Sequence, residues 1–296
     1  MFKTEITDSN KLYFLQQSTL ENLTKKKYEI EDTGALLYLQ HLLYESKEKQ
    51  NIRSVVIDEA QDFSVFQFYA LQRVLDTHLF TILGDLSQGI HAYRGIQNWN
   101  QVAELFQPRD CSIVTLKQSY RTTIEIMNLA NQVIQQLPVS INILAEPIIR
   151  HGKEPELCGF SESNALIDSL LIKIQEVLSE GITSIALITK SKQDGKKLQK
   201  KLGKEQHKFS FQFLSGKVGW KSGTIPIIPS YTVKGLEFDA VIIVNLDEVC
   251  TLDETDIKLL YVAMTRPLHR LYMYYKLDTV LPVAQIASGT KNNNFT

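Results

Sequence analysis

Three carboxylates lie close together directly after a short apolar run, in the segment VVIDEAQDFS at residues 55–64. They are Asp58, Glu59 and Asp62. The apolar residues before them do not alternate with polar ones, which is typical of a parallel strand covered on both faces. Ligands of open parallel sheets bind beyond the carboxyl ends of the strands. The acids are therefore predicted to face a ligand.

An aspartate followed by a glutamate at such a strand end suits Mg²⁺ and water. Asp58 would hold the hydrated Mg²⁺ of a nucleoside triphosphate through water, and Glu59 would orient and deprotonate an attacking water molecule. For an isolated Asp-Glu pair the alternative is that the acids only solvate a turn. Other motifs have to decide between these two interpretations.

The composition is that of a globular chain without a membrane segment. Of its 296 residues, 44% are hydrophobic and 22% are charged, enough for one large domain or two of typical size. The formal net charge of −1 gives no overall attraction to nucleic acid, so such binding depends on local patches. Three widely spaced cysteines favour neither a zinc site nor a disulfide framework. No apolar run reaches the roughly 18 residues of a spanning helix, and no signal peptide is recognisable, so we expect a cytoplasmic protein.

Strands and helices alternate along the chain, which predicts an α/β fold of parallel sheets flanked by helices. Ser64 and Gln67 have the spacing of a capping box at the start of one helix. The expected helices are at 33–47, 65–75, 123–137, 164–180, 193–202 and 254–266, and the expected strands at 54–57, 79–83, 112–116, 184–189, 209–214, 224–231, 240–245 and 270–275. Two domains are predicted, at 1–108 and 109–282, followed by a disordered tail at 283–296.

Five segments resemble, in order, motifs II to VI of the superfamily 1 helicases of the UvrD/Rep type. They are VVIDEAQD, GDLSQGIHAYRG, LKQSYRT, YTVKGLEFD and LLYVAMTR, and together they span residues 55–266. The resemblance implies RecA-like P-loop NTPase architecture, ATP and Mg²⁺ as cofactors, and DNA as the nucleic-acid partner. The segments YEIEDTGALLYL, IPSYTVKGLEFD and TRPLHRL are most similar to the HelD-type enzymes, which implies RNA polymerase as a further partner.

The resemblance also implies roles for four residues at the nucleotide. Gln88 would sense the γ-phosphate, and Arg121 and Arg266 would reach it from the second domain as arginine fingers. Glu237 is expected to contact the nucleotide sugar. The alternatives are structural: Arg121 could cap a helix or pair with an acid, Arg266 could be a solvated helix end, and Glu237 could be a turn carboxylate.

Nucleic-acid contacts are expected at Tyr93 and Arg94, because the resemblance places them in the part of motif III that faces the strand. An aromatic ring there would stack on a base. The alternative for Tyr93 is a place in the core. Residues 190–208 carry eight lysines, which could follow a phosphate backbone, although such a face is more often just solvated.

Several residues depart from the family pattern. Pro229 and Tyr231 replace the usual Thr and His of motif V, which puts direct contact with the nucleic-acid strand there in doubt. Ile257 and Lys258 replace an arginine pair in motif VI. Pro267 follows the finger arginine and biases the backbone before it away from helix.

The largest departure is that no G-x-x-x-x-G-K-[ST] segment occurs in the sequence. Such a loop supplies the backbone N–H groups and the lysine that cradle the phosphates. We therefore interpret the chain as the C-terminal portion of a larger motor, with one partial and one complete RecA-like lobe. Its partner would be a P-loop-containing N-terminal half. The alternative is a module that docks on nucleic acid or RNA polymerase and hydrolyses nothing.

Overall fold

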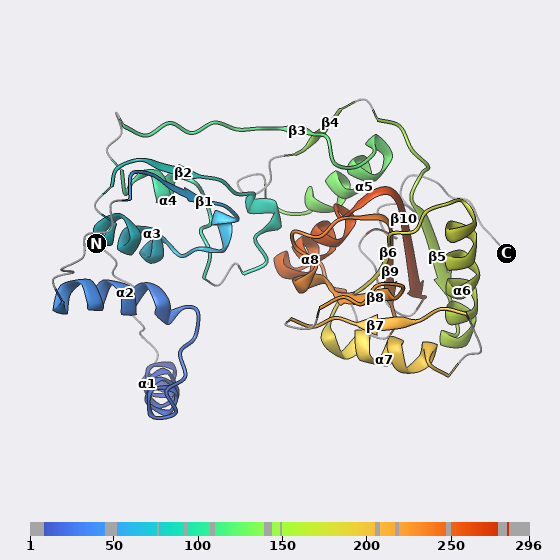
Figure 1. Cartoon of the computed structure of the whole chain (residues 1–296), viewed down its shortest axis with the longest axis horizontal. Coiled ribbons are helices and arrows are strands. Elements are labelled where there is room, and N and C mark those ends of the chain that lie inside the picture. Colours follow the sequence, from blue (N-terminus) through green and yellow to red (C-terminus); the bar gives the residue numbers. More distant parts are fainter. Residues whose placement is uncertain are drawn as a thin grey trace. The chain divides into compact units, whose positions relative to one another are not determined.

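The computed structural model of the chain describes residues 9–44, 52–75, 77–91, 94–106, 110–138, 144–148, 150–204, 208–216, 219–246, 250–277 and 283. The chain forms two compact units (Figure 1). The first unit comprises residues 1–84 and 93–111, and the second comprises residues 85–92 and 112–296. The short segment 85–92, which the sequence places in the first domain, therefore packs with the second unit.

The first unit is a small βαβ arrangement with additional helices. Strands β1 and β2 pair in parallel, and α3 connects them, which confirms the strands expected at 54–57 and 79–83 and the helix expected at 65–75. The expectation that the first strand is covered on both faces is wrong, because Val56 is 68% exposed. Helix α1 was not predicted, and its residues are not buried within the structure. The elements are α1 (Ser9–Thr24), α2 (Asp32–Leu43), β1 (Val55–Ile57), η1 (Ala60–Asp62), α3 (Val65–Val74), β2 (Phe80–Ile82) and α4 (Asn100–Ala103).

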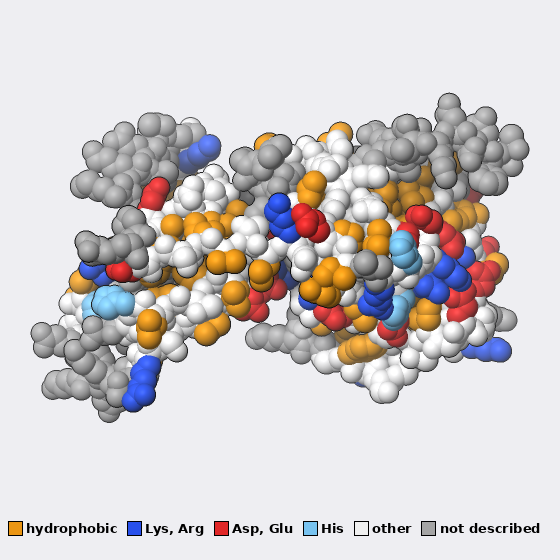
Figure 2. Space-filling model, turned by 90° about the horizontal axis from the view of Figure 1, so that it is seen from above, with side chains coloured by type: hydrophobic (Ala, Val, Ile, Leu, Met, Phe, Trp, Pro, Cys, Tyr) orange, Lys and Arg blue, Asp and Glu red, His pale blue; other side chains and the backbone are white. Residues whose placement is uncertain are grey.

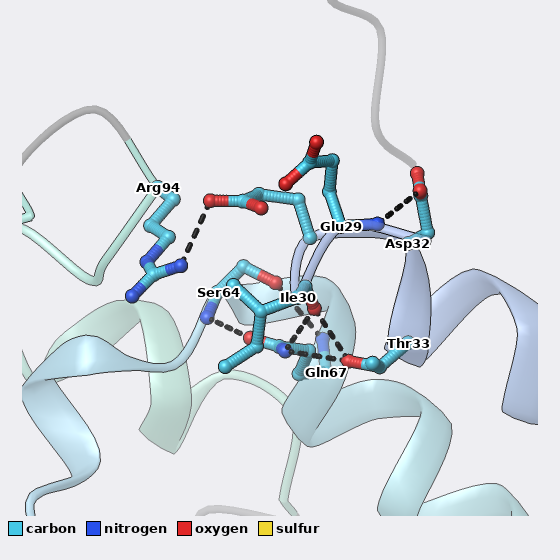
Figure 3. A network of polar contacts seen from close by, with 8 residues as sticks. Glu29, Ile30, Asp32, Thr33, Ser64, Gln67 and Arg94 are labelled. Atoms are coloured by element: carbon cyan, nitrogen blue, oxygen red, sulfur yellow. Dashed lines mark hydrogen bonds and ion pairs between the residues drawn. The ribbon is translucent and has the colours of Figure 1, made fainter. Parts of the chain in front are cut away.

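Gln67 joins the starts of α2 and α3 (Figure 3). Its backbone N–H donates to Ser64 Oγ at 3.2 Å, and its Oε1 accepts from the Ser64 N–H at 2.8 Å, which confirms the capping box. Its Nε2 donates to Thr33 Oγ1 at 3.2 Å. The Tyr38 ring of α2 packs edge-on against the Tyr69 ring of α3, with centroids 5.5 Å apart. The two helices are thus fixed to each other by polar contacts at their amino ends and by aromatic packing.

The second unit is built on a six-stranded sheet in the order β5-β10-β9-β6-β8-β7. Every pair of neighbouring strands is parallel, which confirms the predicted α/β architecture. A separate two-stranded pair, β3 with β4, lies before it in the chain. The elements are η2 (Leu86–Gln88), β3 (Gln118–Ser119), α5 (Ile124–Ile134), β4 (Glu146–Pro147), β5 (Glu156–Phe160), α6 (Ser163–Ser179), β6 (Ile185–Thr189), α7 (Lys192–Leu202), β7 (Phe211–Phe213), β8 (Ile225–Pro229), η4 (Ser230–Thr232), β9 (Phe238–Asn245), α8 (Glu254–Met264) and β10 (Pro267–Lys276).

Two apolar layers cover the two faces of this sheet. Along β9, Val241 and Ile243 pack in one layer with residues of α5 and α8, whereas Ile242 and Val244 pack in the other with residues of α6 and α7. Successive side chains of a strand point to opposite faces. Both faces are therefore buried, which explains why β9 reads as a continuous apolar run rather than an alternating one.

The predicted strand at 112–116 is wrong. These residues have no strand partner, and the side chains of Val114 and Leu116 are exposed. An apolar, β-branched run favours extended backbone, but a strand forms only where another strand pairs with it. The two-residue strand β3 pairs with β4 instead, and β5, which was not predicted, occupies one edge of the sheet.

The ends of two predicted segments also differ or lie outside the described residues. Helix α2 ends at Leu43, and residues 45–47 of the expected helix are outside the described part. Val283 is buried in the core of the second unit, and the rest of the expected tail lies outside the described residues. Among the helices that the structure describes, none is both long and apolar enough to cross a membrane.

Candidate functional site

Asp58 and Glu59 lie where they were predicted, directly beyond the carboxyl end of β1. Glu59 has φ 54°, in the left-handed region that non-glycine residues rarely adopt. Asp58 Oδ1 accepts a hydrogen bond from the Glu59 N–H at 2.8 Å. Strained backbone of this kind is concentrated at functional sites. The turn makes the chain change direction immediately after the strand and places two carboxylates at its end.

Gln61, which the sequence analysis did not identify, orients Glu59. Its Nε2 donates to Glu59 Oε2 at 2.7 Å, and the side chain is buried. Gly84, beyond the end of β2, leaves room for it: a Cβ at that position would lie 2.4 Å from Gln61 Oε1. The role of Gln61 depends on a residue from another strand end, so it is hard to recognise from the sequence around Gln61. The glycine after the predicted strand was the available signal.

The acidic end of β1 fits a metal ion that arrives with its nucleotide. Asp58 is exposed, and one of its oxygens is used by the Glu59 N–H. Within the described ranges, no group of three or more His, Cys, Asp or Glu side chains is placed to hold a metal ion. Mg²⁺ typically keeps several waters and uses one or two carboxylates together with phosphate oxygens. The residues present suit that mode rather than a site made by protein alone.

Gln88 and Arg266 contact each other inside the second unit. Arg266 Nη2 donates to Gln88 Oε1 at 2.8 Å, and Arg266 Nε donates to the Val262 carbonyl at 2.9 Å. Gln88 Nε2 in turn donates to Asp85 Oδ2 at 2.8 Å. The arginine is only 1% exposed, so it is not a solvated helix end. A buried guanidinium is tolerated where hydrogen-bonding partners surround it, as they do here.

Arg121 and Glu237 form an ion pair, with Arg121 Nε 2.7 Å from Glu237 Oε1. Both side chains are part-exposed. The carbonyl of Arg121 also accepts a hydrogen bond from Arg150 Nη1 at 3.3 Å. The alternative that Arg121 pairs with an acid therefore holds in this structure, and its partner is the other residue that was expected at the nucleotide.

These two contacts lie at neighbouring strand starts. The Phe238 N–H, which follows Glu237, donates to the Arg266 carbonyl at 3.2 Å, and Phe238 pairs with Pro267. Glu237 and Arg266 therefore stand at the amino ends of β9 and β10. The end of the sheet formed by these strand starts thus carries two guanidinium groups and a carboxylate. Guanidinium groups match phosphate oxygens, and a carboxylate can accept a hydrogen bond from a sugar hydroxyl.

The predicted nucleic-acid contacts are only partly described. Tyr93 lies outside the described residues. Arg94 Nη1 contacts Glu31 Oε1 at 2.8 Å, next to the start of α2 (Figure 3). In the lysine-rich segment, Leu198 and Leu202 are buried on one side of α7. Figure 2 shows acidic and basic side chains side by side on the visible face of the second unit.

Four of the residues that depart from the family pattern have described positions in the second unit. Ile257 is fully buried, and Lys258 is buried with its Nζ 2.8 Å from Glu254. Pro229 ends β8, and Pro267 begins β10 directly after Arg266. Arg266 therefore lies at a junction between α8 and β10 rather than within the helix.

A second polar cluster, not predicted from the sequence, lies at the opposite end of the sheet, where the strands have their carboxyl ends. Lys190 Nζ is 2.7 Å from Asp256 Oδ2, and the Thr251 N–H donates to the same oxygen at 2.6 Å. Ser230 and Asn245 line a cavity of about 30 Å³ beside them. Such a volume can hold a water molecule. In this cluster the lysine is paired with a carboxylate, whereas the amino ends of β9 and β10 carry two guanidinium groups, which match phosphate oxygens.

Comparison with known proteins gives two family matches. Residues 7–107 match the UvrD/REP helicase N-terminal domain, and residues 225–274 match the UvrD-like helicase C-terminal domain. The two segments contain β1 with its acids and the start of β10 with Arg266, respectively.

Similar proteins include two curated helicases and one solved structure. The ATP-dependent DNA helicase srs2 of Schizosaccharomyces pombe is 34% identical over 29% of this chain and 10% of its own length. The ATP-dependent DNA helicase Rep of Escherichia coli is 30% identical over 36% of this chain and 17% of its own length. The C-terminal domain of a possible DNA helicase from Lactobacillus plantarum WCFS1 is 25% identical, with a TM-score of 0.45, over 56% of this chain and 91% of that one. The chain thus matches less than a fifth of either curated relative.

Proposed function

We propose that this chain is a member of the UvrD/Rep-type superfamily 1 helicases. Its matched N-terminal and C-terminal segments belong to domains of that family. We infer that it supplies part of an ATP-dependent DNA helicase or translocase. The residues that would act on Mg-ATP are Asp58, Glu59, Gln88, Arg121, Arg266 and Glu237. The residues that would contact the DNA strand are Tyr93 and Arg94. A P-loop-containing half would complete the nucleotide site.

The observation that carries this proposal is the pairing of residues with related expected roles. Gln88 contacts Arg266, and Arg121 contacts Glu237. A buried guanidinium needs a hydrogen-bonding partner, because an unpaired buried charge is costly, and Arg266 is buried. Gln88 supplies that partner, and Glu237 pairs with the part-exposed Arg121.

The proposal assigns one chemical role to each of these residues. Mg²⁺, when bound with ATP, would neutralise charge on the β- and γ-phosphates, and Asp58 would hold one of its waters. Glu59, oriented by Gln61, would take the proton from the water that attacks the γ-phosphorus as the bond to ADP breaks. Arg121 and Arg266 would leave their present partners and stabilise the charge on the transferred group.

A second candidate function rests on the missing phosphate loop. A chain without G-x-x-x-x-G-K-[ST] could instead dock on nucleic acid or RNA polymerase and hydrolyse nothing. The similarity of three segments to HelD-type enzymes favours RNA polymerase as that partner, and a cytoplasmic location would follow. Co-purification of the chain with RNA polymerase, with no change on ATP addition, is the expected result for this alternative.

The test of the first function uses the full chain together with a separately made polypeptide that carries a UvrD-type P-loop segment. We expect the chain alone to release no phosphate from ATP above background. The mixture should hydrolyse ATP when single-stranded DNA is present. Arg266→Ala should abolish that activity, because an arginine finger contributes about 10³- to 10⁵-fold to turnover.

Arg270→Gln is the matched control, because Arg270 lies in β10, the strand that begins directly after Arg266, and pairs with Glu180 at 3.6 Å. It should hydrolyse ATP at the parental rate. Steady hydrolysis by the chain alone that Glu59→Gln removes would mean that the chain has its own phosphate-binding loop. Equal loss in both arginine variants would make Arg266 a folding residue only.

A further inference from the structure

His269 lies on a β-bulge of β10, a short distance along the chain from Arg266. The pairing of β9 with β10 shifts by one residue between Pro267 and Arg270. Two residues of β10, the second of which is His269, therefore lie opposite the single residue Asp239 of β9. Bulges re-aim side chains and are frequent next to active sites. The bulge thus decides where the imidazole ring points.

The His269 ring lies between a guanidinium group and a carboxylate. Arg150 Nη2 is 2.7 Å from His269 Nδ1 and 3.2 Å from Nε2, and Nε2 is 3.8 Å from Asp239 Oδ1. Among the described residues these are the charged side chains at the ring, and Arg270 Nη1 donates to the His269 backbone carbonyl instead. A guanidinium can only donate hydrogen bonds, so the nearer ring nitrogen, Nδ1, must accept. His269 is therefore neutral in this arrangement, with its proton on Nε2.

Arg150 extends this contact to the segment that carries Arg121. Its Nη1 donates to the Arg121 carbonyl at 3.3 Å, and its own carbonyl accepts from the Ile124 N–H at 3.0 Å. Residue 150 thus holds the turn 121–124 at both ends. A continuous set of contacts therefore joins β10, which begins directly after Arg266, to the backbone of Arg121.

Protonation of His269 would break this set of contacts. Histidine is the side chain that ordinarily changes charge between about pH 5 and 8. A protonated ring can only donate, so it cannot accept from Arg150, and two cations would then face each other. Asp239 becomes the favoured partner because it is an anion. The ring thus has two arrangements, a neutral one bound to Arg150 and a charged one paired with Asp239.

We propose that His269 is a positioning residue: its neutral form holds Arg150, and through it the backbone of Arg121, and its protonated form releases both. The inference rests on the proposed phosphate-binding role of Arg121. ATP hydrolysis by the completed motor should then decrease as the pH falls and His269 gains a proton. The loss should appear in kcat rather than KM, because an arginine finger acts on charge that develops in the transition state.

The first measurement uses the full chain alone, labelled with ¹⁵N. The ring ¹⁵N shifts distinguish a proton on Nδ1, on Nε2 or on both nitrogens, and His269→Asn identifies the signals. We expect the Nε2–H form at about pH 8. The backbone amide signal of Arg121 should change over the same pH range as the ring signals. In His269→Asn and in Arg150→Met the Arg121 amide should no longer follow that range.

The second measurement is ATP hydrolysis by the chain with the P-loop polypeptide and single-stranded DNA, between about pH 5.5 and 8. At the upper limit, His269→Ala and Arg150→Met should lower kcat by as much as about 100-fold, the effect of displacing a catalytic group by about 1 Å. His269→Asn has an amide oxygen that accepts a hydrogen bond but does not titrate. It should restore most of the activity and remove the decrease in acid.

His78→Asn and His151→Asn are the matched controls. His78 is an exposed histidine of the first unit, and His151 is next to Arg150 in sequence but contacts Glu125 at 2.9 Å. Both variants should keep the parental decrease in acid. Asp239→Asn removes the partner of the protonated ring, so its decrease should begin at lower pH than in the parent.

Four results would overturn the inference. They are a proton on Nδ1 of the neutral ring, an Arg121 amide that does not follow the ring signals, a parental acid profile in His269→Asn, and equally low kcat in His269→Asn and His269→Ala. If hydrolysis still depends on Arg266, these results leave the proposed function intact. If both NMR results are as expected but the completed motor never hydrolyses ATP, the proposed function fails and the pH-dependent contact stands.

Discussion

At the scale of single residues, the nucleotide candidates are held by partners that are themselves site residues or lie beside them. Arg266 and Gln88 are 178 positions apart in sequence and share one hydrogen bond. Glu59 is held by Gln61, whose place depends on the missing side chain of Gly84. A small change behind the site should therefore affect the acids without touching them.

Gly84→Ala tests this dependence. The added Cβ would lie 2.4 Å from Gln61 Oε1 and 2.9 Å from the Trp99 ring, so Gln61 must move and its hydrogen bond to Glu59 is disturbed. Overpacking of this kind costs about 1–3 kcal/mol. We expect the first unit to lose that much in its free energy of unfolding, measured in urea by Trp99 fluorescence in a Trp220→Phe background.

Gly219→Ala is the control for that measurement, because a Cβ there meets no atom within 4 Å. It should leave the transition of the first unit unchanged. A Gly84→Ala protein as stable as the parent would show that Gln61 can shift at no cost, and the conclusion that Gly84 is needed to place Gln61 would be withdrawn.

At the scale of elements, the start of α5 fixes the segment that carries Arg121. The Ile124 N–H donates to the Arg150 carbonyl at 3.0 Å, and Arg150 Nη1 donates to the Arg121 carbonyl at 3.3 Å. In the first turn of α5, Glu125 accepts hydrogen bonds from His151 Nδ1 and from the Gly152 N–H, both at 2.9 Å. The hydrogen bond from His151, with the backbone N–H groups, lowers the pKa of Glu125 from 4.5 to about 2.

The sign of the pH dependence follows from that lowered pKa. Folding favours the charged carboxylate, so its stabilisation is present above pH 4.5 and is lost as the pH falls toward about 2. Glu125→Gln should lower the free energy of unfolding of the second unit at neutral pH by about 1 kcal/mol. It should also flatten the loss of stability in acid. Urea denaturation at a series of pH values measures both effects.

Glu162→Gln is a suitable control because Glu162 is the N-cap residue of α6 and makes no capping hydrogen bond through its side chain. Its acid profile should follow that of the parent. If both variants have the same profile, the contacts of Glu125 do not stabilise the start of α5.

At the scale of the whole molecule, the two units differ in how much core they have. The second buries apolar residues on both faces of a six-stranded sheet. The first has a two-stranded parallel sheet, in which Val56 is 68% exposed. Parallel sheets are stable where both faces are covered, and stability grows with the apolar area removed from water. The first unit should therefore unfold at lower denaturant concentration than the second.

Each unit contains one tryptophan, so the two transitions can be followed separately. Trp220→Phe reports on the first unit through Trp99, and Trp99→Phe reports on the second through Trp220. We expect the Trp99 transition at lower urea than the Trp220 transition, with far-ultraviolet circular dichroism showing both steps in each variant. Coincident transitions would mean that the two units unfold as one cooperative body.

The element pattern could be predicted from the sequence, because it depends on local signals. The apolar run at β9 and the capping box at Ser64 and Gln67 specify structure through neighbours a few residues away. The acids at the end of β1 were found in the same way. The family motifs then supplied candidate roles for residues far apart in the chain.

The contacts between distant segments were decided by the tertiary structure. Nothing local pairs Gln88 with Arg266 or Arg94 with Glu31, because such contacts exist only once the strands and helices have packed. The apolar residues at 112–116 show the same limit from the other side, since β-propensity made them a predicted strand and the lack of a partner strand left them unpaired. Local preference selects backbone conformation, but only packing selects which side chains meet.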